Sequence, residues 1–345
     1  MQTVDLRSDT LTKPSPEMRE VMMTAEVGDD VFGEDPTINR LQEKVAALTG
    51  KEAALLVTSG TQGNQIAINA HTNPGQEIIV DKNSHIFNYE CGGAAMLSGA
   101  QLHALDGQQG VITVEQIAAA YRYSEDHHYP ETGLICLENT HNRAGGSVYP
   151  MAEIQRISQY AREKGLPLHL DGARLWNACI ATGISLSEYC SYFDSVMMCF
   201  SKGLGAPVGS IIVGSAKFIN RAHYYRKAYG GGMRQGGILA AGALFAIENN
   251  WPLLAEDHNR ARDFAEAISE FPGLSVDLST VQTNIVMIDI DPQVMTAAEA
   301  ISRLAEQGIL MISFGPQRIR AVTHLEISND DIAYSVNIFK NLFRK

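Results

Sequence analysis

The sequence predicts an α/β fold in which a mostly parallel sheet is wrapped by helices and is followed by a smaller C-terminal α+β domain. From about residue 40 onward, short apolar runs alternate with longer segments of helical period. Runs that are apolar almost throughout are typical of strands buried on both faces, and their alternation with helices indicates a parallel sheet. The pattern changes near residue 250. We therefore expect a large domain over residues 1–250, which includes an N-terminal arm, and a small domain over residues 251–345.

Six runs are predicted as strands of the large domain: AALLV (53–57), EIIVD (77–81), LICLEN (134–139), LPLHLD (166–171), SVMMCF (195–200) and GSIIVG (209–214). Between the third and fourth runs, MAEIQRISQYAREKG places Ile154, Ile157 and Ala161 on one stripe of a helix. This helix is expected to begin after Pro150 and to end at Gly165, because glycine commonly terminates helices.

The segment after residue 250 is predicted to alternate between helices and strands of a second unit. A long charged helix, LLAEDHNRARDFAEAISEF, leads into a strand, TNIVMIDID. An alanine-rich helix, TAAEAISRLAEQG, follows, and then two strand segments, ILMISF and RIRAVTHLEI. The last helix is expected to begin near Ser328 and Asn329. This order of elements indicates the α+β domain.

Charge limits the partners of the chain. The formal net charge of −12, from 27 Lys and Arg and 39 Asp and Glu, argues against nucleic acid or an anionic membrane, since both attract basic faces. This charge does not exclude a small anionic substrate, which one or two local arginines can bind.

Cysteine usage and hydropathy indicate the compartment. The five cysteines are scattered without a CxxC pair, which suits a reducing cytosol. The segment MQTVDLRSDT lacks the apolar core of a signal peptide. The longest apolar and glycine run, ILAAGALFAI at 238–247, is shorter than the roughly 18 residues that a membrane helix needs. We therefore expect a cytoplasmic protein without a membrane segment.

Polar residues follow several predicted strands at their carboxyl ends, which is where ligands bind in parallel α/β sheets. Gly60 and Thr61 follow the first strand and are expected to open a helix, whose free N–H groups can bind an anion, most often a phosphate. His85, Asp171 and Lys202 follow the second, fourth and fifth strands. A phosphate site, an imidazole, a carboxylate and a lysine are therefore predicted at one edge of the sheet.

These four groups match the requirements of pyridoxal 5′-phosphate. This cofactor forms a Schiff base with a lysine, needs an acid opposite its pyridinium nitrogen, and binds through a phosphate cradle and a ring stacked on its face. Lys202 stands between a buried strand and the turn GLGAPVG, whose glycines let the backbone pass close to a cofactor. We therefore expect Lys202 to bind pyridoxal phosphate covalently.

The sequence resembles the low-specificity L-threonine aldolases along nearly its whole length. Eight segments carry the resemblance, in the order found in that family: DLRSDT (5–10), GDDVFGEDP (28–36), SGTQGN (59–64), ENTHN (138–142), HLDGAR (169–174), SKGLGAPVGS (201–210), GGGMRQ (230–235) and RAVTHLE (320–326). These aldolases belong to the aspartate-aminotransferase fold group, fold type I of the pyridoxal phosphate enzymes. The resemblance therefore implies an aldehyde-lyase with the fold type I large domain and pyridoxal phosphate as its cofactor.

The resemblance implies the roles of the cofactor-binding residues. Lys202 would carry the cofactor, Asp171 would pair with the pyridinium nitrogen, and Gly60 and Thr61 would hold the phosphate. His85 would stack on the ring and shuttle a proton. The residues alone leave other interpretations open, which are a surface lysine, a helix N-cap at Asp171, a plain strand-to-helix turn and a structural histidine.

The resemblance also implies a site for the substrate's α-carboxylate, formed by Arg174 and Arg320 with the help of Ser8. A guanidinium meets a carboxylate through two parallel hydrogen bonds, which fixes orientation as well as charge. Arg174 could instead face the cofactor's phenolic oxygen. Arg320 could instead be a charge at a sheet edge, since Arg318 shares its phase in an alternating segment.

His128 is implied to meet the substrate's β-hydroxyl, with the adjacent His127 as a rival. The choice between His85 and His128 as the main base stays open. Arg234 could add a cation to the phosphate from a neighbouring subunit, or GGGMRQ could be a hinge loop. The sites of this fold group usually borrow residues from a second subunit. We therefore expect a homodimer or homotetramer with shared active sites, and no metal site.

The reaction that the resemblance implies is retro-aldol cleavage of the Cα–Cβ bond. L-threonine, L-allo-threonine and related β-hydroxy-α-amino acids would give glycine and an aldehyde. Another fold type I pyridoxal phosphate lyase, or an aminotransferase acting on a small amino acid, is the alternative.

Three rivals fall outside this cofactor class. GLGAPVG fits a nicotinamide fingerprint poorly, because its glycines follow GxGxxxG. A metal-dependent hydrolase would use His169, Asp171 and either His127 or His128, whose spacing matches no recognised metal site. A non-catalytic scaffold is the third.

Overall fold

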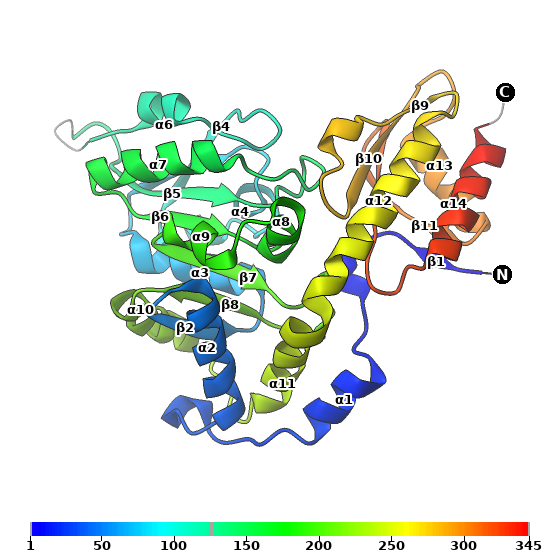
Figure 1. Ribbon diagram of the computed structural model, residues 1–345. Coiled ribbons are helices and arrows are strands. Elements are labelled where there is room, and N and C mark those ends of the chain that lie inside the picture. The colour runs from blue at the N-terminus through cyan, green and yellow to red at the C-terminus, as the bar shows by residue number, and fades with distance from the viewer. Residues whose placement is uncertain (1, 124–126, 344–345) are drawn as a thin grey trace.

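The computed structural model describes residues 2–123 and 127–343, which form two lobes joined by a long helix (Figure 1). Within these ranges, seven strands form the large sheet in the order β2-β8-β7-β6-β5-β3-β4. The strands are β2 (Ala53–Val57), β3 (Glu77–Asp81), β4 (Gln101–Leu105), β5 (Thr132–Glu138), β6 (Leu168–Asp171), β7 (Ser195–Cys199) and β8 (Ser210–Gly214). Strand β8 is antiparallel to both of its neighbours and the other pairings are parallel. The predicted fold class is therefore confirmed.

Helices cover both faces of the large sheet, as strands that are apolar on both sides require. One face packs against α2 (Pro36–Thr49), α7 (Met151–Lys164), α8 (Leu175–Thr182) and α9 (Leu186–Ser191). The other face packs against α3 (Gly60–His71), α5 (Gly93–Ser98) and α10 (Ala216–Ala228). The large lobe also contains α1 (Pro16–Met23), α4 (His85–Asn88) and α6 (Val114–Ala120).

The six predicted strands of the large sheet are all present, each within two residues of the predicted bounds. Helix α7 ends at Gly165, which has a φ of 67° in the left-handed region, as the predicted stop signal requires. Strand β4 was not predicted. It lies at the sheet edge beside β3, and its side chains are exposed or half-buried, so its sequence QLHAL lacks the continuous apolar character of a central strand.

The small lobe contains an antiparallel sheet in the order β12-β13-β10-β9. Its strands are β9 (Leu274–Ser275), β10 (Ile285–Ile290), β12 (Ile312–Gly315) and β13 (Arg318–Val322). Its helices are α12 (Leu254–Ser269), α13 (Ala297–Glu306) and α14 (Asn329–Leu342), the last capped by Ser328 near the predicted start. Together these elements enclose a second hydrophobic core.

The division between the lobes differs from the prediction in two respects. The arm, residues 2–15, begins in the small lobe. Its strand β1 (Val4–Asp5) pairs with β11 (Ile309–Leu310), and Val4 and Leu6 are buried in the core of that lobe. The predicted boundary at residue 250 falls inside a continuous helical stretch, in which α11 (Gly237–Phe245) runs on into α12. The arm and this helix therefore both connect the two lobes.

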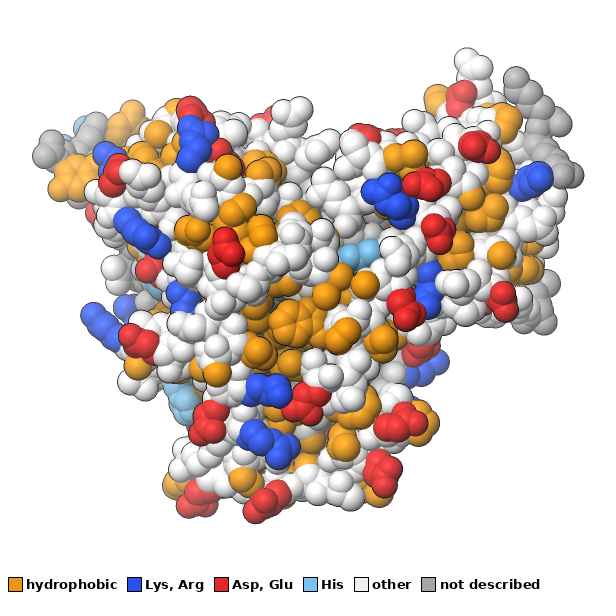
Figure 2. Space-filling model, viewed as in Figure 1, with side chains coloured by type: hydrophobic (Ala, Val, Ile, Leu, Met, Phe, Trp, Pro, Cys, Tyr) orange, Lys and Arg blue, Asp and Glu red, His pale blue; other side chains and the backbone are white. Residues whose placement is uncertain are grey.

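The helical stretch of residues 237–269 is long and apolar enough to cross a membrane by length and composition alone. Its first part, α11, packs against α1 and α2, and its last part, α12, packs against α14. Figure 2 shows hydrophobic side chains gathered in the concave region where this helix passes between the lobes. Packing within the protein therefore accounts for its apolar character, since a helix in a protein core can be as long and as apolar as one that crosses a membrane.

Asp35 fixes the loop that follows the arm. Its carboxylate is fully buried and accepts hydrogen bonds from the backbone N–H groups of Thr37 and Ile38 at 3.1 and 2.9 Å, which caps α2. It also accepts from the N–H groups of Gly28 at 3.2 Å and Gly237 at 2.9 Å. One side chain therefore ties the loop, α2 and the start of α11 together.

We predict that Asp35→Ala lowers the free energy of unfolding by about 2–4 kcal/mol, because buried N–H groups lose a charged acceptor. Asp35→Asn should cost less, since the amide oxygen keeps the cap. Urea denaturation measures the change. The control is Ser185→Ala, which removes the exposed cap of α9 and should cost about 1 kcal/mol. Equal losses in Asp35→Ala and Ser185→Ala would contradict the prediction.

Candidate active site

A cavity of about 160 Å³ lies at the carboxyl ends of the parallel strands. Its lining residues are Gly60, Thr61, Asn64, His85, Glu90, Asp171, Ala173, Met197, Cys199, Ser201 and Lys202. All five residues predicted to hold the cofactor through its phosphate, ring, pyridinium nitrogen and aldehyde are in this set. A larger groove, described below, lies at the opposite end of the strands and contains none of them.

Gly60 and Thr61 begin α3 directly after β2. Ser59 caps this helix by accepting from the N–H of Gln62 at 3.1 Å. The N–H groups of Gly60 and Thr61 belong to the first turn and therefore have no acceptor within the helix. A Cβ at Gly60 would lie 2.9 Å from the Sγ of Cys199. Glycine is therefore needed for α3 to start this close to β7, with its positive end toward the cavity.

Asp171 ends β6 and is buried. Its Oδ1 accepts from the backbone N–H of Ala173 at 3.1 Å, and its Oδ2 accepts from the Nδ2 of Asn64 at 2.9 Å. The first residue of α8 is Leu175 and its N-cap is Arg174, so Asp171 is not the cap of that helix. The carboxylate is instead held rigidly at the base of the cavity.

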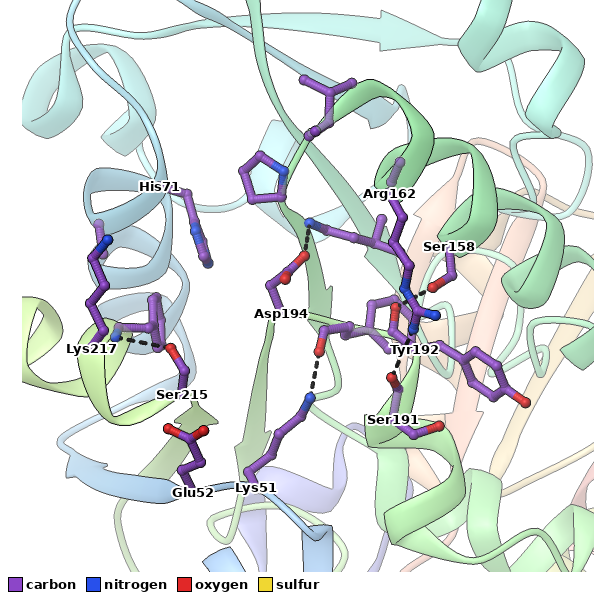
Figure 3. Close-up of a pocket in the computed structure, with 18 of the residues that line it drawn as sticks. Lys51, Glu52, His71, Ser158, Arg162, Ser191, Tyr192, Asp194, Ser215 and Lys217 are labelled. Atoms are coloured by element: carbon purple, nitrogen blue, oxygen red, sulfur yellow. Dashed lines mark hydrogen bonds between the residues drawn. The ribbon is translucent and has the colours of Figure 1, made fainter.

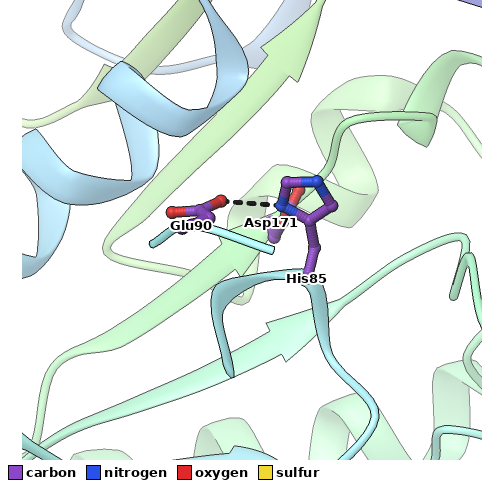
Figure 4. Close-up of side chains that lie close together, drawn as sticks. All are labelled: His85, Glu90 and Asp171. Atoms are coloured by element: carbon purple, nitrogen blue, oxygen red, sulfur yellow. Dashed lines mark hydrogen bonds and ion pairs between the residues drawn. The ribbon is translucent and has the colours of Figure 1, made fainter. Parts of the chain in front are cut away.

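His85, Glu90 and Asp171 form a compact cluster, shown in Figure 4, in which nitrogen and oxygen atoms lie within 4.8 Å of one another. The Nδ1 of His85 bonds to the Oε1 of Glu90 at 2.9 Å, and its backbone N–H donates to the Oε2 of Glu138 at 2.6 Å. Burial lowers the pKa of His85, but the hydrogen bond to Glu90 and the charge of Asp171 outweigh it, so the pKa is raised. Burial also raises the pKa of Glu90.

Two residues of the site were missed or given little weight in the sequence. The Nδ2 of Asn64 donates to both Glu90 and Asp171, at 2.8 and 2.9 Å, and the Nε2 of Gln65 donates to Glu90 at 2.6 Å. Asn64 belongs to the segment SGTQGN and lies one turn into α3, where a polar residue on the sheet-facing side was a usable signal. Glu90 follows His85 by five residues, beyond the end of α4, and the sequence indicated only that it lies on the same segment as His85 and could line the substrate pocket.

Lys202 lies in the turn between β7 and β8. Its carbonyl accepts from the N–H of Gly205 at 2.8 Å, and Gly205 has a φ of 76°, which favours glycine. The hydroxyl of Thr12 in the arm donates to the same carbonyl at 3.3 Å. The turn and the arm therefore present the Lys202 side chain to the cavity that holds Asp171.

Arg174 is buried, and one side of its guanidinium is bound by a residue of the arm. Its Nε and Nη2 donate to the two carboxylate oxygens of Asp9 at 2.7 and 2.6 Å. One of the two paired edges of the guanidinium is thus occupied by Asp9, a residue that the sequence did not single out. The Nη1 side of Arg174 is the part that remains for cofactor or substrate.

Arg320 is buried on β13 rather than exposed at a sheet edge. Its Nη1 donates to the Oδ1 of Asn142 at 2.8 Å and its Nη2 to the carbonyl of Arg7 at 3.0 Å. Its Nε is buried and has no hydrogen-bond partner among the described residues. Burial, with repulsion from Arg174, lowers the pKa of Arg320 to about 10. A bound carboxylate would satisfy Nε and offset that repulsion.

Arg318 and Ser8 lie near Arg320, on its own strand and in the arm. Arg318 is the exposed arginine, at the start of β13, and pairs with Asp289 at 2.6 Å. Ser8 lies in the arm, where its Oγ is 2.8 Å from the hydroxyl of Thr10 and caps a short helical turn. The adjacent arm residues are those that contact Arg174 and Arg320, so Ser8 lies beside both arginines.

His128 is not brought to the cavity within one chain. It precedes Thr132, the first residue of β5, and therefore lies toward the amino end of that strand, whereas Glu138 ends β5 at the cavity. The rings of His127 and His128 lie 4.5 Å apart. The side chain of His169 bonds to Ser195 and Asn64 inside the large lobe. The rival metal set of His169, Asp171 and His127 or His128 is thus not assembled in the described residues.

The residues at the cavity fit pyridoxal phosphate. A helix N-terminus suits the phosphate, the fixed carboxylate of Asp171 suits a protonated ring nitrogen, and Lys202 opens into the same space. Glycine at position 60 also fits, because a Cβ there would meet the side chains of Cys199 and Met197 at this end of α3.

Comparisons with known proteins give one consistent family. Residues 5–291 match the family model of the beta-eliminating lyases. The chain is 44% identical over 344 residues to low-specificity L-threonine aldolase 1 of Arabidopsis thaliana, covering 99% of this chain and 96% of the relative. It is 42% identical over 331 residues to the low specificity L-threonine aldolase of Escherichia coli K12, covering 96% of each.

A structural comparison agrees with these matches. The threonine aldolase of Leishmania major superposes with a TM-score of 0.84 at 22% identity and 99% coverage of both chains, which supports the fold. The chain therefore belongs to the beta-eliminating lyase family and, within it, to the low-specificity L-threonine aldolases, a family that depends on pyridoxal phosphate.

Proposed function

We propose that this chain cleaves L-threonine, L-allo-threonine and related β-hydroxy-α-amino acids to glycine and an aldehyde. This proposal rests mainly on the observation that Lys202, Asp171, His85 and the start of α3 line one cavity, with two buried arginines beside the arm. When bound, pyridoxal phosphate supplies a ring that accepts the electron pair released when a bond to the substrate's Cα breaks. The residues of the chain decide where the substrate lies and where its protons go.

The cofactor would be held at three points. Lys202 would bind it covalently, and the N–H groups of Gly60 and Thr61 would bind its phosphate. Asp171 would accept a hydrogen bond from the ring nitrogen and keep the proton there, because its carboxylate is fixed by Asn64 and by the N–H of Ala173. His85 would lie against the ring face.

Arg320 would be the main ligand of the substrate's α-carboxylate, with Ser8 and the free side of Arg174 beside it. The unpartnered Nε of Arg320 supports this role. Fixing the carboxylate decides which bond to Cα is presented to the cofactor, so these residues would select Cα–Cβ cleavage over loss of the α-proton.

His85 would act as the base that removes the β-hydroxyl proton. Because Glu90 accepts a hydrogen bond from Nδ1, the neutral imidazole carries its proton on Nδ1 and can accept another at Nε2. His128 is the second candidate, and it requires another subunit.

The product mixture tests the proposed reaction. Purified holoenzyme incubated with L-threonine should release glycine and acetaldehyde in equal amounts. Formation of 2-oxobutyrate would indicate β-elimination instead, and amino transfer to an added keto acid would indicate an aminotransferase. Either product in place of glycine would reject the aldolase proposal.

We predict that Arg320→Gln raises the KM for L-threonine and lowers kcat/KM by about 10²–10³-fold, because one charged partner of the carboxylate is lost. Steady-state kinetics measures both constants. Arg318→Gln is the matched control, since Arg318 lies on the same strand and pairs with Asp289 at the surface. Similar losses in both variants would contradict the assignment of Arg320.

We further propose that the protein is a homodimer or homotetramer in which one subunit completes the site of another. The position of His128 away from its own cavity supports this. Exposed apolar side chains on α1, the following loop and α11 also support it: Val21, Met23, Val27, Phe32 and Ile238. Arg234 pairs with Asp29 in the same region, at 3.0 Å.

Subunit mixing tests the sharing of sites. If His128 serves a partner's site, Lys202→Ala and His128→Phe chains each lose activity, but a hybrid dimer contains one site with both residues intact. Refolding an equal mixture should restore about a quarter of the wild-type activity, since half of random dimers are hybrids. No recovery in proven hybrids would show that His128 does not serve a partner's site.

We also propose a cytoplasmic location. All five cysteines are unpaired in the structure, and four of them are buried, which suits a reducing compartment. Cell fractionation with an antibody to the protein tests this, and recovery in a membrane or secreted fraction would reject it.

A further inference from the structure

A chain of buried hydrogen bonds leaves the cofactor cavity from Asp171 and crosses the space between α3 and the large sheet. The Nδ2 of Asn64 lies 2.9 Å from Asp171 Oδ2, and the Oδ1 of Asn64 lies 3.1 Å from the Nε2 of His169. The Nδ1 of His169 is 2.8 Å from the Oγ of Ser195, which is 2.8 Å from the Nε2 of His71. Five side chains are thus joined end to end.

The periods of the strand and the helix explain this alignment. His169 and Asp171 are two residues apart on β6 and therefore face the same side, toward α3. Ser195 is opposite His169 in the register of β6 and β7. Asn64 and His71 are seven residues apart on α3, two turns or about 10 Å along one face of the helix. The chain therefore runs parallel to β6 from its carboxyl end toward its amino end.

The direction of each hydrogen bond follows from Asn64. Both of its N–H groups are used by carboxylates, those of Asp171 and Glu90, so its Oδ1 must accept from the Nε2–H of His169. A neutral His169 then accepts at Nδ1 from the hydroxyl of Ser195. The Ser195 oxygen in turn accepts from the Nε2–H of His71. Every donor in the chain points toward Asp171.

The environment favours neutral imidazoles in both positions. Asn64, His169 and Ser195 are fully buried. Burial lowers the pKa of His169 to about 3 and that of His71 to about 4. Two neutral histidines with Nε2–H tautomers are the arrangement that the direction of the chain requires.

His71 ends the chain in a groove of about 800 Å³ at the amino ends of the strands. Its ring stacks on Phe218, with ring centroids 4.7 Å apart. Figure 3 shows His71 on one side of this groove and Arg162 and Ser158 on the other, with Asp194 between them. The far end of the chain is therefore accessible to solvent at the amino ends of the strands, whereas the cofactor cavity lies at their carboxyl ends.

We propose that His169, Ser195 and His71 are positioning residues of the cofactor site, which hold the Asn64 amide so that both of its N–H groups bind Asp171 and Glu90. The proposal rests on the proposed function, in which Asp171 pairs with the ring nitrogen. Without the chain, the Asn64 amide can rotate and its oxygen can face a carboxylate. Asp171 then loses a charged hydrogen bond that fixes it beneath the cofactor.

Cofactor affinity tests the proposal without relying on turnover. His169→Phe and Ser195→Ala should raise the Kd of pyridoxal phosphate for the apoprotein between about three- and tenfold, the effect of one or two lost hydrogen bonds. His169→Gln retains an N–H able to reach Asn64 and should stay within about twofold of wild type. In the holoenzyme, kcat should fall while the KM for L-threonine is unchanged, since Arg320 is not affected.

Ser158→Ala is the matched control. Ser158 is also buried beside the groove, but its hydroxyl donates to the carbonyl of Tyr192 at 2.7 Å and does not contact the chain. His71→Phe keeps the ring on Phe218 and removes the donor, so it should raise the Kd even if Ser195→Ala folds poorly. Wild-type Kd values in His169→Phe, Ser195→Ala and His71→Phe, with melting temperatures lowered as in Ser158→Ala, would overturn the proposal.

Nitrogen NMR of protein labelled with ¹⁵N-histidine gives a second readout. The signals of His169 and His71, assigned from the two Phe variants, should both show a proton on Nε2 and none on Nδ1 at neutral pH. An Nδ1–H tautomer at either position would reject the direction of the chain. If wild-type protein binds pyridoxal phosphate and cleaves threonine but these results fail, only the positioning role is wrong. If it does neither, the proposed function is wrong.

Discussion

Lys202→Ala is expected to lower kcat for threonine cleavage by at least about 10³-fold and to abolish covalent retention of pyridoxal phosphate. The side chain lies in the turn after β7 and lines the cavity with Asp171, His85 and the start of α3. Removing its amine takes away the only group in that lining that can bind the cofactor aldehyde. The variant should still bind the cofactor reversibly through the phosphate and ring contacts.

Borohydride reduction followed by peptide mass mapping measures this result. In the wild-type protein the reduced cofactor should be found on the peptide that contains Lys202, and in the variant it should be on none. Lys217→Ala is the control, because Lys217 lines the groove at the opposite end of the strands. Labelling of another lysine in wild-type protein would reject the role of Lys202 and the site built around it.

Much of the fold was predictable because the large sheet is buried on both faces. Strands such as β2 contain no polar residue, and helix α7 has a clear apolar stripe and ends at a glycine. Strand β4 was not predicted, because an edge strand with half-exposed side chains lacks a continuous apolar run. The arm was predicted, but its place in the small lobe was not, because its pairing with β11 joins residues about 300 positions apart, which no local pattern reveals.

The candidate site was predictable where a residue follows its own strand. Gly60, His85, Asp171 and Lys202 were placed by strand ends alone, since parallel strands bring their carboxyl ends to one edge. The partners of these residues were not. The contact between Asp9 and Arg174 joins residues 165 positions apart and depends on how the arm packs against the large lobe.

Arg318, Arg320 and His128 show the same limit of prediction from local sequence. Arg318 and Arg320 have the same phase in β13, and only the packing of the lobes decides that Arg320 is buried beside Arg174. His128 has the right residue type, but the strand that follows it carries it away from its own cavity. Sequence order therefore identified the groups, and tertiary packing decided their partners.

Asp9 is the contact through which the arm holds both lobes and the arginines together. It is fully buried, binds the Nε and Nη2 of Arg174, and accepts from the Nδ2 of Asn284 in the small lobe at 3.2 Å. Asp9→Ala leaves the Arg174 charge buried without its partner. We therefore predict a loss of about 3–5 kcal/mol in the free energy of unfolding, with a matching loss of activity as Arg174 moves.

The control for this prediction lies four residues away in the same arm. Asp5 pairs with Arg7, and both side chains are partly exposed. Asp5→Ala should change the free energy of unfolding by less than about 1 kcal/mol, as is usual for surface pairs. Urea denaturation of both variants measures the difference. Equal losses of unfolding free energy in the two variants would contradict the prediction that the buried Asp9 pair stabilises the fold more than the exposed Asp5 pair.

The same contact predicts how stability depends on pH. Burial acts to raise the pKa of Asp9, but the charge of Arg174 and its hydrogen bonds outweigh burial and hold the pKa well below its usual range. Because the folded-state pKa lies below the unfolded value of about 3.9, this stabilisation is complete above that pH and is lost as the pH falls below it. The free energies of wild type and Asp9→Asn, measured by urea denaturation, should therefore converge below about pH 4. A constant difference from pH 6 to pH 3 would mean that the buried pair is not what acid disrupts.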